Sequence, residues 1–221
     1  MDWTALGLSL RLALLTCVLL VPLAVLLALW LRRLPAPAGR LVEVIGALPL
    51  VLPPTALGYW LLVALGRGSP LGELWERLTG RPLVFTFEGI LLASLVFNLP
   101  FAVQPIARGL AAIPRELREA AWLCGLGPLG AFVKVELPLL RPSLVVALVL
   151  VFAHTLGEFG VVLMVGGAIP GETRTASVAL YDAVQALDER TAALLSAVLL
   201  AFALTALLVL QLVEPRRERT R

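Results

Sequence analysis

Five long apolar runs divide this chain, and no other feature constrains its fold as strongly. They cover about residues 10–32, 43–66, 88–108, 142–165 and 191–213. A helix needs about 20 mostly apolar residues to cross a bilayer, and each run has that length. Only 15% of the residues are charged, against about 25% in soluble domains, which excludes a soluble globular fold. We predict an all-α integral membrane protein with five transmembrane helices in a single domain, residues 1–221.

The basic residues predict how the chain is oriented. Twelve of the 18 Lys and Arg residues lie after the first, third and fifth runs, and six lie in the alternate segments. Loops rich in Lys and Arg stay in the cytoplasm. We therefore predict a multi-pass protein of the bacterial inner membrane, with the N-terminus outside and the C-terminus cytoplasmic. Because these residues flank apolar runs, they indicate a topology signal beside membrane lipid rather than binding of nucleic acid.

Two segments on the predicted outer side have the pattern of short amphipathic helices. Residues 69–82 place apolar side chains on one helical face, namely Leu71, Leu74, Trp75 and Leu78. Residues 175–187 repeat this kind of pattern. We predict that the first of these helices lies along the membrane surface.

A polar insert, residues 112–139, separates the third and fourth runs on the predicted cytoplasmic side. Pro114 suits the first turn of a helix, where its missing N–H has no consequence. Gly125 can supply the left-handed residue that ends such a helix. Pro128 can begin a second short helix, which Pro138 would stop. The insert is therefore predicted to form two short helices with a bend between them.

The insert carries a pattern of fixed residue types: Glu-Ala-Ala, three residues, Gly, nine residues, an apolar residue, any residue, and Leu-Pro. The matching residues are Glu119, Ala120, Ala121, Gly125, Val135, Leu137 and Pro138. This pattern closely resembles the signature of the permease subunits of bacterial ABC importers. The resemblance implies the type I importer permease fold, with a coupling helix that docks into a cleft of a cytoplasmic ATPase. Ala120 and Ala121 would offer it a small, flat surface, and Arg118 and Glu119 polar contacts at the edge.

The chain has no G-x-x-x-x-G-K-[ST] phosphate loop. We therefore predict no catalytic residue, no metal site and no cofactor in this chain, with ATP and Mg²⁺ bound to a separate ATPase subunit. The resemblance further implies that two copies of the chain pair to form the pore. It also implies that a periplasmic binding protein delivers an oxyanion to the outer mouth.

Three stretches narrow the resemblance to molybdate permeases: "LPLVLPPTALGYWLLVALGRGSPLG", "LGEFGVVLMVGG" and "AIPGETRTASVALYDAVQ". The I-P-G-x-T-x-T pattern at residues 169–175 favours molybdate over sulfate, although Ala168 stands where this group often has Asn. Sulfate permeases share the G-E-F-G pattern at residues 157–160, so a sulfate, thiosulfate or tungstate permease is the alternative in this class.

A stand-alone membrane transporter or a membrane enzyme is the alternative from another class. An enzyme should cluster acids, His or Cys at one membrane face, and a secondary transporter usually has inverted repeats.

Polar residues within the apolar runs are candidates for the translocation pathway or its gate: Thr55, Asn98, Gln104, His154 and Glu158. Polar residues at such depth usually face the bundle interior or a cavity. His154 and Glu158 are four residues apart, so they would share a helix face and can pair. We favour a structural or gating role for Glu158, because a bare carboxylate repels an anionic cargo.

Prolines are predicted to interrupt two of the runs. Pro49, Pro53 and Pro54 fall in the second, and Pro100 and Pro105 in the third. Breaks in a membrane helix are tolerated where protein or a water-filled cavity satisfies the freed backbone groups. These two runs are therefore expected to line the pathway or to act as hinges, with a static kink as the alternative.

Overall fold

The structure is a computed structural model that describes residues 2–213. Its regular structure is helical, with no strand among those residues. The helices are α1 (Trp3–Leu31), α2 (Ala36–Val51), α3 (Pro54–Leu65), α4 (Pro70–Thr79), α5 (Phe87–Ala112), α6 (Arg115–Leu123), α7 (Pro128–Ala131), the π-helix η1 (Phe132–Glu136), α8 (Leu137–Gly157), α9 (Gly160–Gly166), α10 (Ala176–Gln185) and α11 (Glu189–Val213). The basic residues at 216–221, part of the orientation argument, lie outside the described range.

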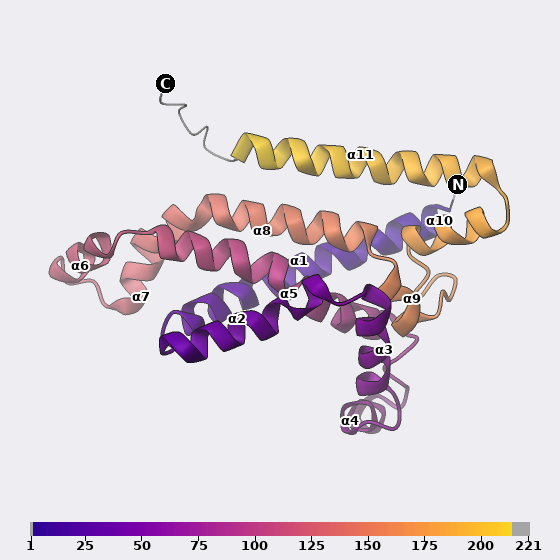
Figure 1. Ribbon diagram of the computed structural model, residues 1–221, viewed down its shortest axis with the longest axis horizontal. Helices are drawn as coiled ribbons and strands as arrows, with labels where there is room; N and C mark the ends of the chain where they lie inside the picture. The colour runs from indigo at the N-terminus through magenta and orange to yellow at the C-terminus, as the bar shows by residue number, and fades with distance from the viewer. Residues whose placement is uncertain (1, 214–221) are drawn as a thin grey trace.

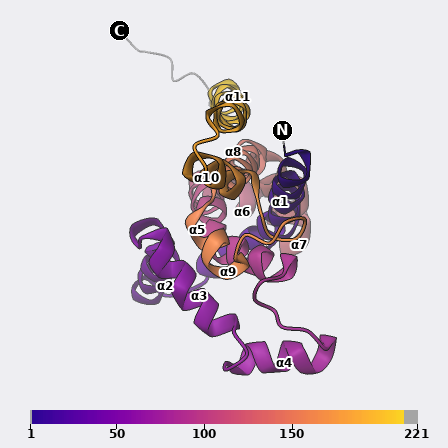
Figure 2. The same ribbon diagram turned by 90° about the vertical axis from the view of Figure 1, so that its right-hand side faces the viewer.

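A bundle of long helices forms the body of the molecule (Figure 1). The helices α1, α5 and α8 pack against one another, and α11 runs beside α8. One end of the bundle carries α6 and α7, and the other carries α10 and the N-terminus. Seen end-on, α3 and α4 project away from this bundle (Figure 2).

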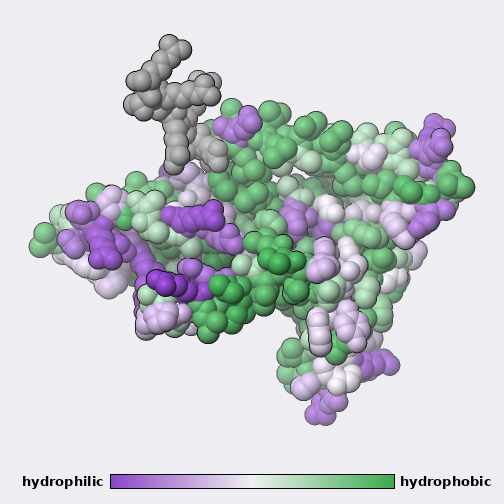
Figure 3. Space-filling model, in the orientation of Figure 1, coloured by the Kyte–Doolittle hydropathy of each residue, from purple (hydrophilic) through white to green (hydrophobic). Residues whose placement is uncertain are grey.

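Small residues let the central helices approach closely. Ala13, Ala24 and Ala28 of α1 are buried, and close packing through small side chains drives the association of membrane helices. At Gly109 in α5, an added Cβ would lie 2.2 Å from the Ser143 Oγ of α8. Large apolar side chains remain exposed on the outer helices, such as Leu212 at 85%. Apolar residues cover α11 in the space-filling view (Figure 3), as expected for a surface in contact with lipid.

Four helical segments are long and apolar enough to cross a membrane: residues 3–31, 87–112, 128–157 and 189–212. A fifth span is possible if α2 and α3 count together, although they are bent by 112°. The predicted count of five spans agrees with the larger of these two numbers.

The second run breaks where predicted, between Leu52 and Pro54. The backbone of Leu52 and Pro53 is extended because a residue before proline avoids the α region. Pro49, by contrast, lies inside α2. The prediction for the third run is wrong: α5 continues through Pro100 and Pro105. Packing of α5 against both α1 and α8 holds the helix together where these two residues lack a donor.

The fourth run differs from its predicted limits of 142–165 at both ends. Its helix is continuous from Pro128 and ends at Gly157. Glu158 is extended, with φ −67° and ψ 128°, and the apolar residues that follow form the separate helix α9. Gly160 allows the close approach at this break, since an added Cβ there would lie 2.9 Å from the Cβ of Pro54 in α3.

The two predicted amphipathic helices are present as α4 and α10. The hydroxyl of Ser69 caps α4 by accepting a hydrogen bond from the N–H of Gly72 at 2.9 Å. Leu71, Leu74 and Leu78 are exposed on α4, which fits a helix that lies on a membrane surface.

Candidate functional site

The polar insert forms a bent pair of helices at one end of the bundle, where hydrophilic residues gather (Figure 3). Gly125 has a φ of +80° and ends α6, as predicted. The N–H of Leu126 donates to the carbonyl of Ala121 at 3.0 Å, and that of Gly125 to Trp122 at 2.9 Å. This pair of bonds is a Schellman motif, which needs a left-handed residue at the position of Gly125.

The prediction that Pro138 stops a second short helix is wrong. The helix α7 runs on through η1 into α8 without a break. The N–H of Leu137 reaches back to the carbonyl of Phe132, five residues earlier, which is a π-type bond. A π-turn is one of the local adjustments by which a membrane helix accommodates proline.

The residues of the ABC importer pattern differ in how far they are exposed to solvent. Glu119 and Ala120 are exposed, whereas Ala121 is only 5% exposed, so only one of the two alanines presents an open surface. Arg118, Val135 and Leu137 are half-buried, and Pro138 is exposed. The tip of the pair carries apolar side chains open to solvent, with Leu123 at 90% and Leu129 at 76% exposed. The sequence reasoning missed the buried Glu136, which lies within this pattern at the position that accepts any residue.

A second polar cluster lies where α5, α8 and α9 meet. Asn98 is fully buried, and its Nδ2 donates to the carbonyl of Ser94 at 2.8 Å. Its Oδ1 lies 2.9 Å from the Nδ1 of His154. The imidazole also stacks on the ring of Phe101, with centroids 4.1 Å apart. The predicted pairing of His154 with Glu158 is wrong, because α8 ends between them and Glu158 leaves the helix face.

Glu158 is 4% exposed and is held mainly from neighbouring elements. The hydroxyl of Ser94 donates to its Oε2 at 3.2 Å. The hydroxyl of Ser177, at the start of α10, donates to its main-chain carbonyl. Within residues 2–213 its Oε1 has no hydrogen-bond partner. These contacts from α5 and α10 were not predicted, because nothing in the pattern of single apolar runs links them.

Three of the five pathway candidates line one pocket of about 480 Å³: Thr55, His154 and Glu158. Asn98 supports the imidazole of His154 without lining the pocket. Gln104 lies apart, in a cavity of about 670 Å³ between α1, α2 and α5, where it accepts a hydrogen bond from Arg108 at 3.4 Å. Four of the five candidates therefore line two separate cavities, and Asn98 lies behind His154.

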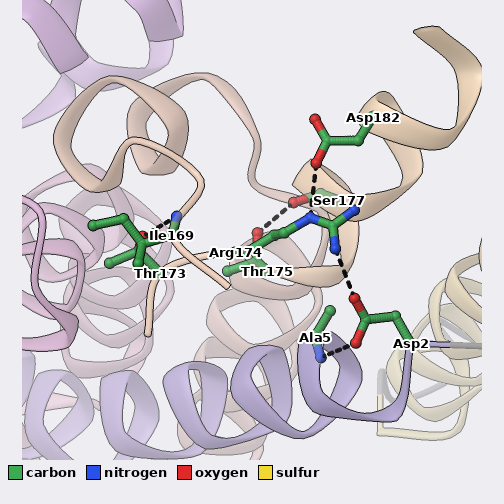
Figure 4. A network of polar contacts seen from close by, with 8 residues as sticks. All are labelled: Asp2, Ala5, Ile169, Thr173, Arg174, Thr175, Ser177 and Asp182. Carbon is green, nitrogen blue, oxygen red and sulfur yellow. Dashed lines mark hydrogen bonds and ion pairs between the residues drawn. The ribbon is translucent and has the colours of Figure 1, made fainter. Parts of the chain in front are cut away.

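The segment after α9 is held by a network of side chains (Figure 4). The hydroxyl of Thr173 donates to the carbonyl of Gly166 at 2.6 Å and accepts from the N–H of Ile169 at 2.9 Å. Arg174 pairs with Asp182 of α10 at 2.7 Å and with Asp2 at 2.9 Å. The I-P-G-x-T-x-T residues thus build a turn that ties α10 to the start of α1.

Comparison with known proteins shows which family this architecture belongs to. The family model described as "Binding-protein-dependent transport system inner membrane component" matches residues 20–219. The chain belongs to this family. It is therefore a multi-pass inner-membrane permease of a binding-protein-dependent transporter.

Curated relatives of this permease include molybdenum and sulfate permeases. The chain is 45% identical over 187 residues to the molybdenum transport system permease protein ModB of Azotobacter vinelandii, covering 85% of this chain and 83% of the relative. It is 36% identical to the ModB protein of Escherichia coli K12, covering 94% and 91%. It is 31% identical to a probable sulfate transport system permease protein, cysT, of Helicosporidium sp. subsp. Simulium jonesii, covering 93% and 76%.

The solved structures confirm the predicted fold class of the permease. A bacterial ABC transporter involved in the import of the acidic polysaccharide alginate matches with a TM-score of 0.71, covering 95% of this chain and 76% of that chain. The identity is 18%, so this likeness concerns the fold alone. The permease has the all-helical type I importer fold.

Proposed function

We propose that this permease passes molybdate across the inner membrane as the membrane subunit of an ATP-driven ABC importer. Sequence identity is the observation that favours molybdate as the substrate. The chain is 45% identical to a molybdenum permease, against 31% to a probable sulfate permease. Both comparisons cover more than four fifths of the chain. Sulfate, thiosulfate and tungstate are the rival cargoes.

Uptake by the reconstituted complex tests this proposal. The permease, its ATPase and its periplasmic binding protein are placed in proteoliposomes, and labelled molybdate, sulfate and tungstate are offered separately. We expect ATP-dependent uptake of molybdate that an excess of unlabelled sulfate does not reduce. Sulfate uptake at the same rate would assign the permease to the other group.

Two copies of the chain and two ATPase subunits form the complex in this proposal, with ATP and Mg²⁺ bound to the ATPase. The pair α6–α7 enters the ATPase and acts as the coupling element. The exposed Leu123 and Leu129 at its tip support this role, because apolar side chains that open to water inside a cell gain by burial against a partner.

Replacing Leu123 with glutamate is expected to prevent copurification with the ATPase. The change places a charge in an interface core, where charged residues are depleted. Leu78→Glu in α4 is the matched control, since Leu78 is 75% exposed and lies in the projecting helix rather than at this tip. Equal recovery of the ATPase with both variants would show that the tip is not the docking surface.

Orientation completes the proposal: α6 and α7 lie in the cytoplasm, and α4 and α10 lie outside. An impermeant thiol reagent applied to intact cells is expected to label Arg77→Cys, since the Arg77 side chain is 77% exposed. The natural Cys124 is exposed beside Gly125 and should react only after the cells are permeabilised. Labelling of Cys124 in sealed cells would reverse the orientation.

The pocket of Thr55, His154 and Glu158 lies on the pathway in this proposal, with the hydroxyl of Thr55 as a donor to the oxyanion. Glu158 shapes the break after α8 instead of contacting the cargo. Modification of Thr55→Cys by a bulky thiol reagent is expected to reduce uptake to background, because Thr55 is exposed at the pocket. Thr205→Cys, exposed on α11, is the control. Undiminished uptake after full labelling at position 55 would remove this pocket from the pathway.

A further inference from the structure

One buried carboxylate joins three helical elements at the end that carries α6. Glu136 closes η1 and is 2% exposed. Its Oε1 lies 2.6 Å from an Nη1 of Arg32, which directly follows α1. The same oxygen lies 3.5 Å from the Nη1 of Arg118 in α6. The end of α1, the middle of α6 and the base of α8 therefore meet at a single oxygen atom.

The buried carboxylate of this cluster depends on both of its charged partners. A carboxylate taken out of water is tolerated when charged partners and hydrogen bonds replace its hydration. The two guanidinium groups do so here, and both remain partly exposed, at 32% for Arg32 and 20% for Arg118, so that water solvates the excess positive charge. Loss of one partner of a buried pair is far more disruptive than loss of an exposed pair.

The helix α6 has few other attachments to the bundle. It packs chiefly against α7 and η1, and most of its side chains are exposed. Arg118 makes the ion pair between α6 and the rest of the described chain. Its neighbours in sequence, Glu119 and Ala120, are on the exposed surface that the ATPase would meet. The π-helix that ends at Glu136 is the second unusual feature here, and such turns occur frequently at functional sites.

We infer that Glu136 is a positioning residue that sets the angle of α6 against the membrane bundle. It acts through Arg118, and Arg32 anchors it to α1. The inference rests on the proposed coupling role of α6. Movement of α6 by the ATPase then reaches α1 and α8 together, because both contact the same carboxylate.

The test compares transport with ATP hydrolysis in proteoliposomes that hold permease, ATPase and loaded binding protein. Glu136→Gln keeps the shape of the side chain and removes its charge. We expect the complex to assemble, but the molybdate delivered per ATP hydrolysed to fall about tenfold, within the range that coupling between sites spans. Arg118→Gln should give a similar fall, and the double variant should be no worse than Glu136→Gln alone, since all three variants lack the ion pair between residues 118 and 136.

Arg81→Gln is the matched control. Arg81 pairs with Glu88 at the same 2.6 Å, but their side chains are 53% and 37% exposed, and the pair lies at the end of α5 away from α6. Its ratio of molybdate to ATP should equal that of the wild type.

Two outcomes would overturn the inference. In the first, Glu136→Gln keeps the wild-type rates of both uptake and hydrolysis. In the second, uptake and hydrolysis fall in equal proportion, which indicates a structural role alone. If Glu136→Gln does not accumulate, Arg118→Gln decides, because it leaves Glu136 paired with Arg32; an unchanged ratio there rejects the inference. Failure of the proposed function is seen separately, as a wild-type complex that shows no ATP-dependent molybdate uptake.

Discussion

Replacing Gly125 with valine is expected to stop molybdate uptake while leaving the permease folded in the membrane. Gly125 has a φ of +80°, and an added Cβ there meets no atom within 4 Å. The effect therefore comes from the backbone alone. A residue with a Cβ loses about 1–2 kcal/mol in the left-handed region, and a β-branched residue is a marked outlier there. We expect the bend between α6 and α7 to open, so that the exposed Glu119 no longer meets the proposed ATPase partner.

Gly127 supplies the control for this prediction. It lies two residues further along, an added Cβ there also meets no atom within 4 Å, and its φ of −70° is one that valine adopts. Gly127→Val should therefore keep uptake and the stimulation of ATP hydrolysis by loaded binding protein. Gly125→Asn should retain part of both, since asparagine visits the left-handed region. Wild-type uptake by Gly125→Val would show that the bend does not matter for coupling.

Replacing Gly109 with valine is expected to lower the thermal unfolding temperature of the purified permease markedly. An added Cβ would lie 2.2 Å from the Oγ and 2.7 Å from the Cβ of Ser143, so α5 and α8 must separate. Overpacking of this kind typically destabilises by about 1–3 kcal/mol. Ser143→Gly should restore part of the loss in the double variant, because it removes both atoms.

The control is Gly46→Val in α2, where an added Cβ meets nothing within 4 Å. Both glycines lie inside helices, so the two variants share the same change in helix propensity. The difference between their unfolding temperatures then reports the contact with Ser143. Equal temperatures would mean that the α5–α8 crossing relaxes freely.

Features that depend on local chemistry could be predicted from the sequence. Hydropathy locates the long helices, because each apolar run has to satisfy its own backbone within lipid. Gly125 could be placed because only glycine enters the left-handed region without penalty. The break at Pro53 follows likewise from the missing N–H and the restricted residue before it.

Features that depend on tertiary contacts could not be predicted. The helix break at Glu158 leaves no trace in hydropathy, since the apolar residues 161–165 continue the run. It is held by Ser177, which lies 19 residues away. Pro138 behaved differently from the prediction because a π-turn before it keeps the helix continuous. The partner of His154 was missed because Asn98 comes from another helix, 56 residues earlier.

The unbroken helix from Pro128 to Gly157 can transmit a displacement from one end of the molecule to the other. Its 30 residues span about 45 Å at 1.5 Å per residue. One end lies beside the bend at Gly125, and the other ends one residue before Glu158. Tilting a rod of this length by about 5° displaces its far end by about 4 Å, which exceeds the diameter of a water molecule. A small rocking motion at the end beside Gly125 would thus move the end beside Glu158 by more than the diameter of a water molecule, with no helix changing its internal structure.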